Sequence, residues 1–395
     1  MDALSQLRSQ PERLVVGLMT GTSLDGVDAV LVRVRGSGTS LALDSLSFVH
    51  RPYPDRLRAL LLRNTDPALS AVDHLTTLNV RLCSLYADAV DQALDAAGYT
   101  RNALDLVGSH GQTMHHVPTP VDCAGERVRA TCQIGSPSTL AQHLNTVVVG
   151  QFRMADMACG GQGAPLVPYF DHAVFSNPDE TRLLLNLGGI ANATILPAGE
   201  PLSAVRAFDT GPGNMVIDAL AKQLVGAPYD IDGQHAAAGT PNYDLLATLL
   251  QADYFQQPPP KSTGRARFGT DYADRLRREA RTRNLSPQDT LATATLLTAT
   301  SVYQAYARFL RSSDTVDTVI ASGGGVHNDT LLRMLSDAFA PIPVRTTAAY
   351  GMNPDAKEAL CFAVLAHEAV NGVATNVPAV TGAERPARLG VVAAP

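Results

Sequence analysis

Two distant stretches of the chain share one pattern: a short apolar run, a glycine turn and a second short apolar run. In the first, residues 14–18 and 29–34 flank a turn with two glycines; in the second, residues 182–187 and 193–196 flank Gly188-Gly189. Short apolar runs bounded by turn residues are typical of buried strands. The pattern therefore predicts two sheets that each begin with a hairpin, and it suggests an ancient duplication of that unit.

The rest of the chain alternates between strand-like and helix-like stretches. Helical patterns cover residues 70–98 and 286–310, and short apolar runs at 104–108, 147–149 and 318–321 predict further strands. This alternation indicates an α/β fold in which helices cover the sheets. At roughly 150 residues per domain, the 395 residues of the chain suffice for two lobes of this kind.

Each of the two expected lobes contains one of the hairpins. We expect a first lobe that comprises residues 1–150 and about 375–395, and a second lobe that comprises residues 151–374. Hydrophobic residues make up 45% of the chain and charged residues 17%, the balance of an ordinary globular protein. The chain therefore has enough apolar material for a core in each lobe.

Charge and cysteine usage exclude several classes of protein. The formal net charge of -6 argues against a broadly basic nucleic-acid binder, and no apolar run approaches the roughly 18 residues of a membrane span. The five cysteines are scattered without a C-x-x-C pair, which argues against a disulfide scaffold or a structural zinc site. Because the first residues also lack the apolar core of a signal peptide, we expect a cytoplasmic protein with reduced thiols.

The turn between the first two strands is a candidate phosphate-binding site. Glycines allow backbone N–H groups to converge on one point, and hydroxyl side chains add further donors. Asp25 or Asp28 can hold Mg²⁺ through water, since this ion keeps part of its hydration shell. A ligand-free Asp-Gly hairpin turn explains the local pattern equally well. The candidate residues are Gly21, Thr22, Ser23, Leu24, Asp25, Gly26, Val27 and Asp28.

Two further glycine turns strengthen the case for a nucleotide. Gly188-Gly189 lies in the second hairpin, and Gly323, Gly324 and Gly325 follow a strand and open a helix. Tight packing explains each turn about as well as a ligand does, but three such turns in one α/β chain favour nucleotide binding. A Walker-type loop is excluded, because the chain contains no Gly-Lys dipeptide.

Two carboxylates are candidates for acid–base or sugar-binding roles. Asp209 follows the apolar run 204–208 and precedes a Gly-Pro-Gly turn, where α/β folds often assemble active sites. It can equally cap the helix that starts near Asn214. Asn353-Pro354 predicts a helix start, and Glu358 then lies on an apolar stripe, which is costly unless it meets a ligand or a partner. Alternatively, Glu358 is an exposed boundary residue.

Three further polar residues stand beside these candidates. His110 lies in a Ser-His-Gly-Gln-Thr segment, but a lone histidine is more often a satisfied core group than a catalytic base. Asp156 precedes the glycine-rich loop 160–163, where it either binds substrate or pins the loop. Arg153 likewise either binds substrate or pins this loop.

Seven segments together resemble the signature segments of the anhydro-N-acetylmuramic acid kinase family. They keep the family's order from about residue 16 to residue 390. The segments are GTSLDG (21–26), SHGQT (109–113), GGQGAPLVP (160–168), NLGGIAN (186–192), FDTGPGN (208–214), KSTGR (261–265) and SGGG (322–325).

The resemblance implies a fold, a reaction and its cofactors. The implied fold is the two-lobed actin-like ATPase (sugar kinase) fold, with an interlobe active-site cleft. The implied reaction converts 1,6-anhydro-N-acetylmuramic acid, ATP and water into N-acetylmuramic acid 6-phosphate and ADP, with Mg²⁺. It belongs to the cytoplasmic recycling of cell-wall sugars, and the family suggests a homodimer.

The resemblance also implies roles for individual residues. Asp209 would be the general base, Glu358 would bind the sugar, and Thr113, Phe152 and Arg153 would line the sugar pocket. The turn 21–28 would hold the ATP phosphates. The chain departs from the family's pattern at position 151, where it has Gln151 and the family often has an acidic residue. Many actin-like kinases have an Asp two residues before the first glycine, but this chain has Met19 there. Asp25 is therefore left as the metal candidate.

Two other functions remain open. One is another actin-like kinase that acts on an open amino sugar. The other is a nucleotide-switched binding or filament protein, although this function needs neither Asp209 nor Glu358.

Overall fold

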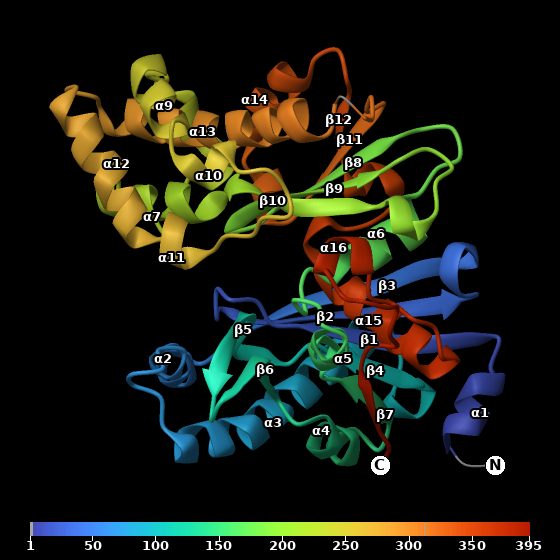
Figure 1. The fold of residues 1–395 in the computed structure, drawn as a ribbon. Coiled ribbons are helices and arrows are strands. Elements are labelled where there is room, and N and C mark those ends of the chain that lie inside the picture. The colour runs from blue at the N-terminus through green and yellow to red at the C-terminus, as the bar shows by residue number, and fades with distance from the viewer. Residues whose placement is uncertain (1–2, 312) are drawn as a thin grey trace. The chain divides into compact units, whose positions relative to one another are not determined.

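The computed structural model describes residues 3–311 and 313–395, and its contacts divide the chain into two compact units. Unit 1 comprises Met1–Val174 and Ala356–Pro395, and unit 2 comprises Phe175–Asp355. Both units combine a mixed β-sheet with helices (Figure 1), which confirms the α/β class predicted from the sequence. Within the described residues, no helix is long and apolar enough to cross a membrane.

The contacts divide the chain at other places than the sequence pattern suggested. Helices α5 (Phe152–Ala158) and α15 (Lys357–Asn371), expected in the second lobe, lie in unit 1. The reason is packing at long range, since α15 lies on strands of the unit 1 sheet. A local pattern carries no information about which sheet a buried helix covers.

The unit 1 sheet has six strands in the order β13-β7-β4-β1-β2-β3. Strands β1, β2 and β3 form an antiparallel meander, whereas β4 and β7 run parallel to β1 and β13 runs antiparallel to β7. The strands are β1 (Glu12–Met19), β2 (Gly26–Arg35), β3 (Ala42–Pro52), β4 (Leu106–Ser109), β7 (Val147–Gly150) and β13 (Val391–Ala393). A separate hairpin consists of β5 (Gln112–Cys123) and β6 (Glu126–Ile134).

Helices cover both faces of this sheet. The helices α3 (Val72–Ala96), close to the predicted 70–98, and α4 (Pro137–Leu144) pack on one face through a shared apolar core. The opposite face carries α15, which is buried from Ala359 to Val370. Shorter helices complete the unit: α1 (Ala3–Ser9), α2 (Asp55–Asn64), α5, α6 (Val167–Phe175) and α16 (Pro378–Thr381).

Two paired glycines bring α15 close to the sheet. Gly17 of β1 lies opposite Gly108 of β4 in the register. A Cβ atom would lie 1.9 Å from the Ala359 carbonyl oxygen at Gly17, and 2.1 Å from the Phe362 carbonyl oxygen at Gly108. Only glycine permits this approach, so the pair fixes where the first turns of α15, including Glu358, lie in unit 1.

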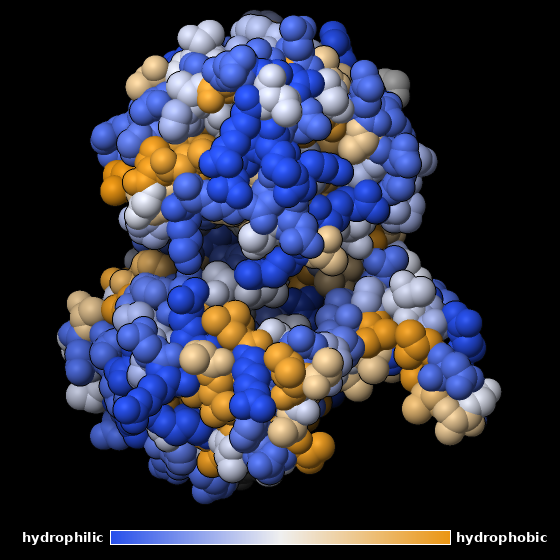
Figure 2. Space-filling view, turned by 90° about the vertical axis from the view of Figure 1, so that its left-hand side faces the viewer, coloured by the Kyte–Doolittle hydropathy of each residue, from blue (hydrophilic) through white to orange (hydrophobic). Residues whose placement is uncertain are grey.

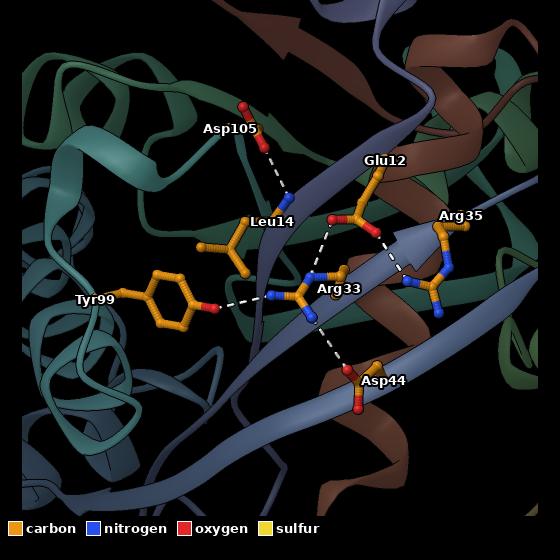
Figure 3. Close-up of polar contacts among 7 residues, drawn as sticks. All are labelled: Glu12, Leu14, Arg33, Arg35, Asp44, Tyr99 and Asp105. Carbon is orange, nitrogen blue, oxygen red and sulfur yellow. Dashed lines mark hydrogen bonds and ion pairs between the residues drawn. The ribbon is translucent and has the colours of Figure 1, made fainter.

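The end of β1 farthest from the glycine turn is held by a polar network, which Figure 3 shows. The Arg33 guanidinium pairs with Glu12 at 3.1 Å and Asp44 at 3.3 Å, and it donates to the Tyr99 hydroxyl at 2.8 Å. The Leu14 N–H donates to Asp105 at 2.7 Å. Exposed ion pairs contribute little stability, so the network mainly holds the register of the strands.

The unit 2 sheet repeats the strand arrangement of unit 1. Its order is β10-β9-β8-β11-β12, with an antiparallel meander β8-β9-β10 and with β11 and β12 parallel to β8. The two predicted hairpin-first sheets are therefore confirmed. The strands are β8 (Arg182–Leu187), β9 (Ile190–Leu196), β10 (Arg206–Pro212), β11 (Thr318–Ser322) and β12 (Val344–Thr346).

Helices pack around this sheet through two apolar cores. The predicted helix 286–310 is α13 (Pro287–Phe309), which Ser286 begins through a capping box with Asp289. Only one face of α12 (Thr270–Thr282) is buried, and Figure 2 shows hydrophilic side chains on this end of unit 2. The other helices are α7 (Asn214–Leu224), α8 (Gln234–Ala237), α9 (Tyr243–Leu250), α10 (Asp253–Gln256), α11 (Arg265–Phe268) and α14 (Asp329–Phe339).

Candidate active-site residues

The first glycine turn presents polar side chains to solvent. Leu24 is buried and adopts a left-handed conformation with a φ of 54°, which anchors the turn to the core. Thr22, Ser23 and Asp25 are exposed, and the Ser23 hydroxyl donates to the Asp25 carboxylate at 2.7 Å. The turn thus exposes hydroxyl groups and one carboxylate beside glycine backbone, the chemistry expected of a phosphate and magnesium site.

The predicted segment 109–113 braces this turn. The Thr20 hydroxyl donates to the Gly111 carbonyl at 2.8 Å, and the Gln112 amide donates to the Gly21 carbonyl at 3.1 Å. The Tyr53 hydroxyl donates to the Gln112 side-chain oxygen at 3.2 Å. Two segments that the sequence pattern singled out separately therefore form one structure within unit 1.

The two metal candidates have different surroundings. Asp28 on β2 contacts His50 at 2.7 Å, and His50 lies directly opposite it on β3. This carboxylate therefore takes part in a contact between the two strands. Asp25 is exposed beside Ser23 and offers oxygen ligands of the kind that Mg²⁺ prefers. No group of three or more His, Cys, Asp or Glu residues suited to a metal occurs within residues 3–311 and 313–395. Mg²⁺ does not need such a cage, because substrate phosphates and water complete its shell.

Arg153 is held on several sides within unit 1. Its Nε and Nη2 donate to Nε2 of His110 at 3.2 and 2.9 Å, and its Nη1 donates to the Gly163 carbonyl at 2.8 Å. Burial lowers the pKa of Arg153, and the nearby Glu358 carboxylate raises it. The structure therefore brings together two of the predicted sugar-binding residues.

The other predicted sugar-binding residues differ in exposure. Thr113 is half-buried at the start of β5 and accepts a hydrogen bond from the Gln133 side chain at 3.2 Å. The Phe152 side chain is only 1% exposed and packs on Phe362 with a centroid distance of 5.4 Å. In unit 1 this ring therefore faces the core, which is not what a pocket-lining role predicts. Gln151, which precedes it, is exposed.

Glu358 is half-buried in the first turn of α15. The predicted helix start is present as a short 3₁₀ turn, Pro354–Ala356, followed by α15. The next residues on the expected stripe are buried, as predicted, but so is the rest of the helix up to Val370. Sequence periodicity thus correctly placed Glu358 at the edge of a buried helix. It predicted an exposed face as well, but every residue from Ala359 to Val370 is buried.

Asp156 pins the glycine-rich loop. The carboxylate is fully buried and accepts hydrogen bonds from the Gly163 N–H at 2.7 Å, the Thr381 hydroxyl at 2.7 Å and the Asn376 amide at 2.9 Å. Because both carboxylate oxygens already have donors, the loop-pinning role is the one that the geometry supports. The loop in turn supplies the carbonyl that holds Arg153.

In unit 2, Asp209 lies on β10 at a β-bulge. The Thr263 N–H donates to one carboxylate oxygen at 2.8 Å, and the Tyr254 hydroxyl donates to the Asp209 carbonyl at 2.8 Å. The carboxylate does not cap α7, because the N-cap residue of this helix is Gly213 and no side chain caps it. Burial raises the pKa of Asp209 to about 6, although the Thr263 N–H and Lys261 act in the opposite direction.

The segment 261–265 holds Asp209 through its backbone. The Lys261 ammonium donates to the Tyr254 carbonyl at 3.1 Å, and it lies 4.7 Å from the Tyr254 ring centroid and 4.9 Å from that of Phe309. Burial lowers the pKa of Lys261 to about 8, and the positive charge of Arg308 adds to this effect. The lysine therefore packs on aromatic rings beside the Asp209 loop.

The second and third glycine turns meet within unit 2. The Asn214 N–H donates to the Gly188 carbonyl at 2.8 Å, and the Gly213 N–H donates to the Gly189 carbonyl at 3.0 Å. A Cβ atom at Gly325 would lie 2.5 Å from the Leu187 side chain, so this glycine permits close packing on the hairpin. The hairpin, the start of α7 and the turn 323–325 thus form one cluster.

A row of polar residues crosses the unit 2 sheet, and sequence patterns did not reveal it. Ser322 lies opposite Asn186, Asn186 opposite Asn192, and Asn192 opposite Asp209. Residues opposite one another in a sheet share a face, so the asparagines connect the turn 323–325 with Asp209. The segment 186–192 carried both asparagines, but only the register shows that they align.

Comparisons with known proteins agree on one family. The family model described as anhydro-N-acetylmuramic acid kinase matches residues 13–395. The chain is 62% identical over 395 residues, 100% of both chains, to the anhydro-N-acetylmuramic acid kinase of Salinibacter ruber. It is 42% identical over 394 residues to that of Caldanaerobacter subterraneus, covering 99% of this chain and 100% of the relative.

A solved structure of an activator of 2-hydroxyisocaproyl-CoA dehydratase from Clostridium difficile aligns with 91% of this chain and 96% of that one. The TM-score is 0.47 and the identity is 12%. The match of the family model to nearly the whole chain and the full-length identity of 62% show that the chain belongs to the anhydro-N-acetylmuramic acid kinase family.

Proposed function

We propose that the chain is an ATP-dependent kinase that opens 1,6-anhydro-N-acetylmuramic acid with water and phosphorylates O6. The products are N-acetylmuramic acid 6-phosphate and ADP. The observation that carries the proposal is identity along the whole length, 62% in one case, with relatives named for this activity. Asp209 supplies a suitable base, because its half-buried carboxylate has a pKa raised to about 6 by burial.

The proposed reaction joins two steps. Asp209 accepts a proton from the water that attacks C1, while O6 leaves C1 and attacks the γ-phosphorus of ATP. The first step has the form of an inverting glycoside hydrolysis, and the second that of an in-line phosphoryl transfer. A carboxylate whose pKa lies near 6 is ionised at neutral pH and is a stronger base than an ordinary one. The Thr263 N–H holds this carboxylate in place through one oxygen.

Binding roles are assigned to the remaining candidates by their chemistry. Residues 21–28 bind the ATP phosphates through backbone amides and the exposed hydroxyls of Thr22 and Ser23. When bound at Asp25, Mg²⁺ supplies charge stabilisation for the transferred phosphoryl group. The cluster of Gly188, Gly189 and residues 323–325 binds the nucleotide, where glycine backbone permits close approach.

Glu358, Arg153 and Thr113 contact the sugar, and Phe152 supports them from the core. We also assign the protein to the cytoplasmic recycling of cell-wall sugars, as a homodimer. Both assignments rest on the family to which the chain belongs.

Incubation with Mg-ATP and the anhydro-sugar tests the reaction. We expect a product with the mass of N-acetylmuramic acid 6-phosphate, and in ¹⁸O-water we expect one labelled oxygen at C1, since water attacks that carbon. Label found only in inorganic phosphate would mean ATP hydrolysis instead. Preference for open N-acetylmuramic acid would indicate the rival sugar kinase, and sugar-independent ATP turnover with polymer formation would indicate a filament protein.

The pH dependence tests the role of Asp209. The carboxylate must be ionised to accept a proton, and its pKa is raised to about 6. We therefore expect kcat/KM to fall about tenfold for each pH unit below about 6 and to be level above it. The residual activity of Asp209→Asn should not fall in this way at acidic pH. A level wild-type profile down to pH 4.5, in protein shown by circular dichroism to be folded, would contradict the assignment.

A further inference from the structure

His110 is a buried neutral imidazole with a defined acceptor. It follows β4, is 3% exposed, and its ring lies 4.7 Å from that of Phe362. Because an arginine can only donate, Nε2 of His110 is the acceptor of both hydrogen bonds from Arg153 and the ring proton lies on Nδ1. Burial and the charge of Arg153 lower the pKa of His110 far below its ordinary value, which keeps the acceptor available.

The contacts of His110 leave the Arg153 guanidinium little freedom. Two of its nitrogens point at His110, and the third donates to the Gly163 carbonyl at 2.8 Å. Gly163 is itself fixed, because its N–H donates to the buried Asp156 carboxylate at 2.7 Å. Arg153 is thus held by His110 and by the Gly163 carbonyl, and both of these groups are themselves held in the core of unit 1.

His110 also contacts the helix that carries Glu358. Phe362 lies four residues after Glu358, on the same face of α15. Gly17 and Gly108 fix this part of α15 against the sheet. His110 therefore touches the element that carries Glu358 and also holds the arginine whose charge interacts with Glu358.

We propose that His110 is a positioning residue for sugar binding, which holds the Arg153 guanidinium beside Glu358 so that the carboxylate keeps one fixed orientation toward the sugar. The proposal rests on the proposed function, in which Glu358 binds the substrate. A fixed carboxylate loses less conformational entropy when it accepts a hydroxyl or amide N–H of the sugar. Loss of the His110 acceptor should therefore weaken sugar binding more than ATP binding.

The other groups around Arg153 do not compete for this role. Burial and the charge of Arg153 lower the pKa of His116 to about 4, and burial, with Asp171 and Glu358, raises that of Cys361. Both are therefore uncharged at neutral pH. Lys357 forms its own buried ion pair with Asp171 at 2.8 Å.

Unit 1 contains a matched control for His110. His367 is also buried, and its Nδ1 accepts a hydrogen bond from the buried Arg13 at 3.0 Å while its Nε2 donates to the Gly36 carbonyl at 2.9 Å. This pair lies near the other end of α15 and has no assigned role in binding. Substitution of either histidine should cost stability, but only His110 should affect the sugar.

The test compares His110→Phe, which keeps a ring on Phe362 but removes the acceptor, with His110→Gln, which keeps an acceptor. In His110→Phe we expect the KM for the anhydro-sugar to rise roughly 10- to 100-fold, because Arg153 and Glu358 then have to be ordered when the sugar binds. The KM for ATP should stay within about twofold, and His110→Gln should recover part of the loss. His367→Phe should lower the melting temperature without changing the sugar KM.

A double-mutant cycle with Glu358→Gln adds a second readout. Calorimetric sugar binding should show that the two substitutions are not additive, because His110 acts through the same carboxylate. Additive effects, or a sugar KM in His110→Phe within twofold of wild type, would overturn the proposal. Wild-type enzyme measured in parallel separates the two hypotheses: if it forms no product from the anhydro-sugar, the proposed function itself fails.

Discussion

Asp209→Asn should lower kcat by roughly 10²- to 10⁴-fold, which corresponds to about 3–5 kcal/mol in the activation free energy. The amide is nearly isosteric, and its oxygen can still accept the Thr263 N–H that donates to Asp209 at 2.8 Å. It cannot accept a proton from water, however. ATP affinity should therefore stay close to that of the wild type while turnover, measured by ADP release with the anhydro-sugar, is lost.

Stability separates this loss from unfolding. Burial raises the pKa of Asp209, so its ionised form costs folding free energy, and the cost appears as the pH rises from the ordinary value toward about 6. Asp209→Asn should therefore melt no lower than wild type at pH 7.5. Asp230 offers a control carboxylate in unit 2, because it is buried and accepts two backbone N–H groups at 2.9 Å.

We expect Asp230→Asn to lower the melting temperature and leave kcat within about threefold, since no role in the reaction is assigned to it. The opposite pattern, with near-normal kcat in Asp209→Asn, would remove Asp209 from the mechanism.

The fold followed from local patterns because its main elements are local. The apolar runs at 14–18 and 182–187 form β1 and β8, and each begins a hairpin of its sheet, as predicted. The helical pattern located the start of α13 to within a residue, and the structure shows a local cause, a capping box between Ser286 and Asp289. These signals depend on a few neighbouring residues and not on contacts with distant parts of the chain.

The surroundings of the site residues depended on contacts between distant segments. Lys261 belongs to a segment that the sequence singled out by its resemblance to the family, and the rings of Tyr254 and Phe309 that contact its ammonium could not be foreseen. Phe152 was expected in a sugar pocket, but its ring packs on Phe362, more than two hundred positions later in the chain. A sequence pattern shows that a residue is polar or aromatic, but not which side chains will meet it.

The helix α15 illustrates the same limit most clearly. Its apolar stripe predicted one buried face, yet Lys357, His367 and Glu368 are buried as well. Their partners are Asp171, Arg13 and the loop 36–38, which lie far away in the sequence. A polar residue on a buried helix is tolerated where such partners satisfy it, so the fold had to be known before the helix could be recognised as buried all round.

The removal of Glu368 should show how much these partners matter. The carboxylate is fully buried and accepts hydrogen bonds from the Ser37 hydroxyl at 2.5 Å, the Gly38 N–H at 2.7 Å and the Tyr169 hydroxyl at 2.9 Å. Burial raises the pKa of Tyr169, and the Glu368 charge adds to this, so the phenol remains a donor. Without this carboxylate, the buried Tyr169 hydroxyl and the half-buried Ser37 and Gly38 donors would all lose their acceptor.

Glu368→Ala should therefore lower the free energy of unfolding by about 2–4 kcal/mol, measured by chemical denaturation. Glu368→Gln should lose about half as much or less, since its oxygen can still accept from Gly38 and Tyr169 and the Ser37 hydroxyl can rotate to accept from the amide. Glu279→Ala is the control, because Glu279 pairs with Arg283 at 2.6 Å on the surface of α12, where such a pair contributes only about 0.3–0.5 kcal/mol. If Glu368→Ala cost no more than Glu279→Ala, water would have to reach the three donors, and the buried cluster that joins α15 to the loop 36–38 would not stabilise unit 1.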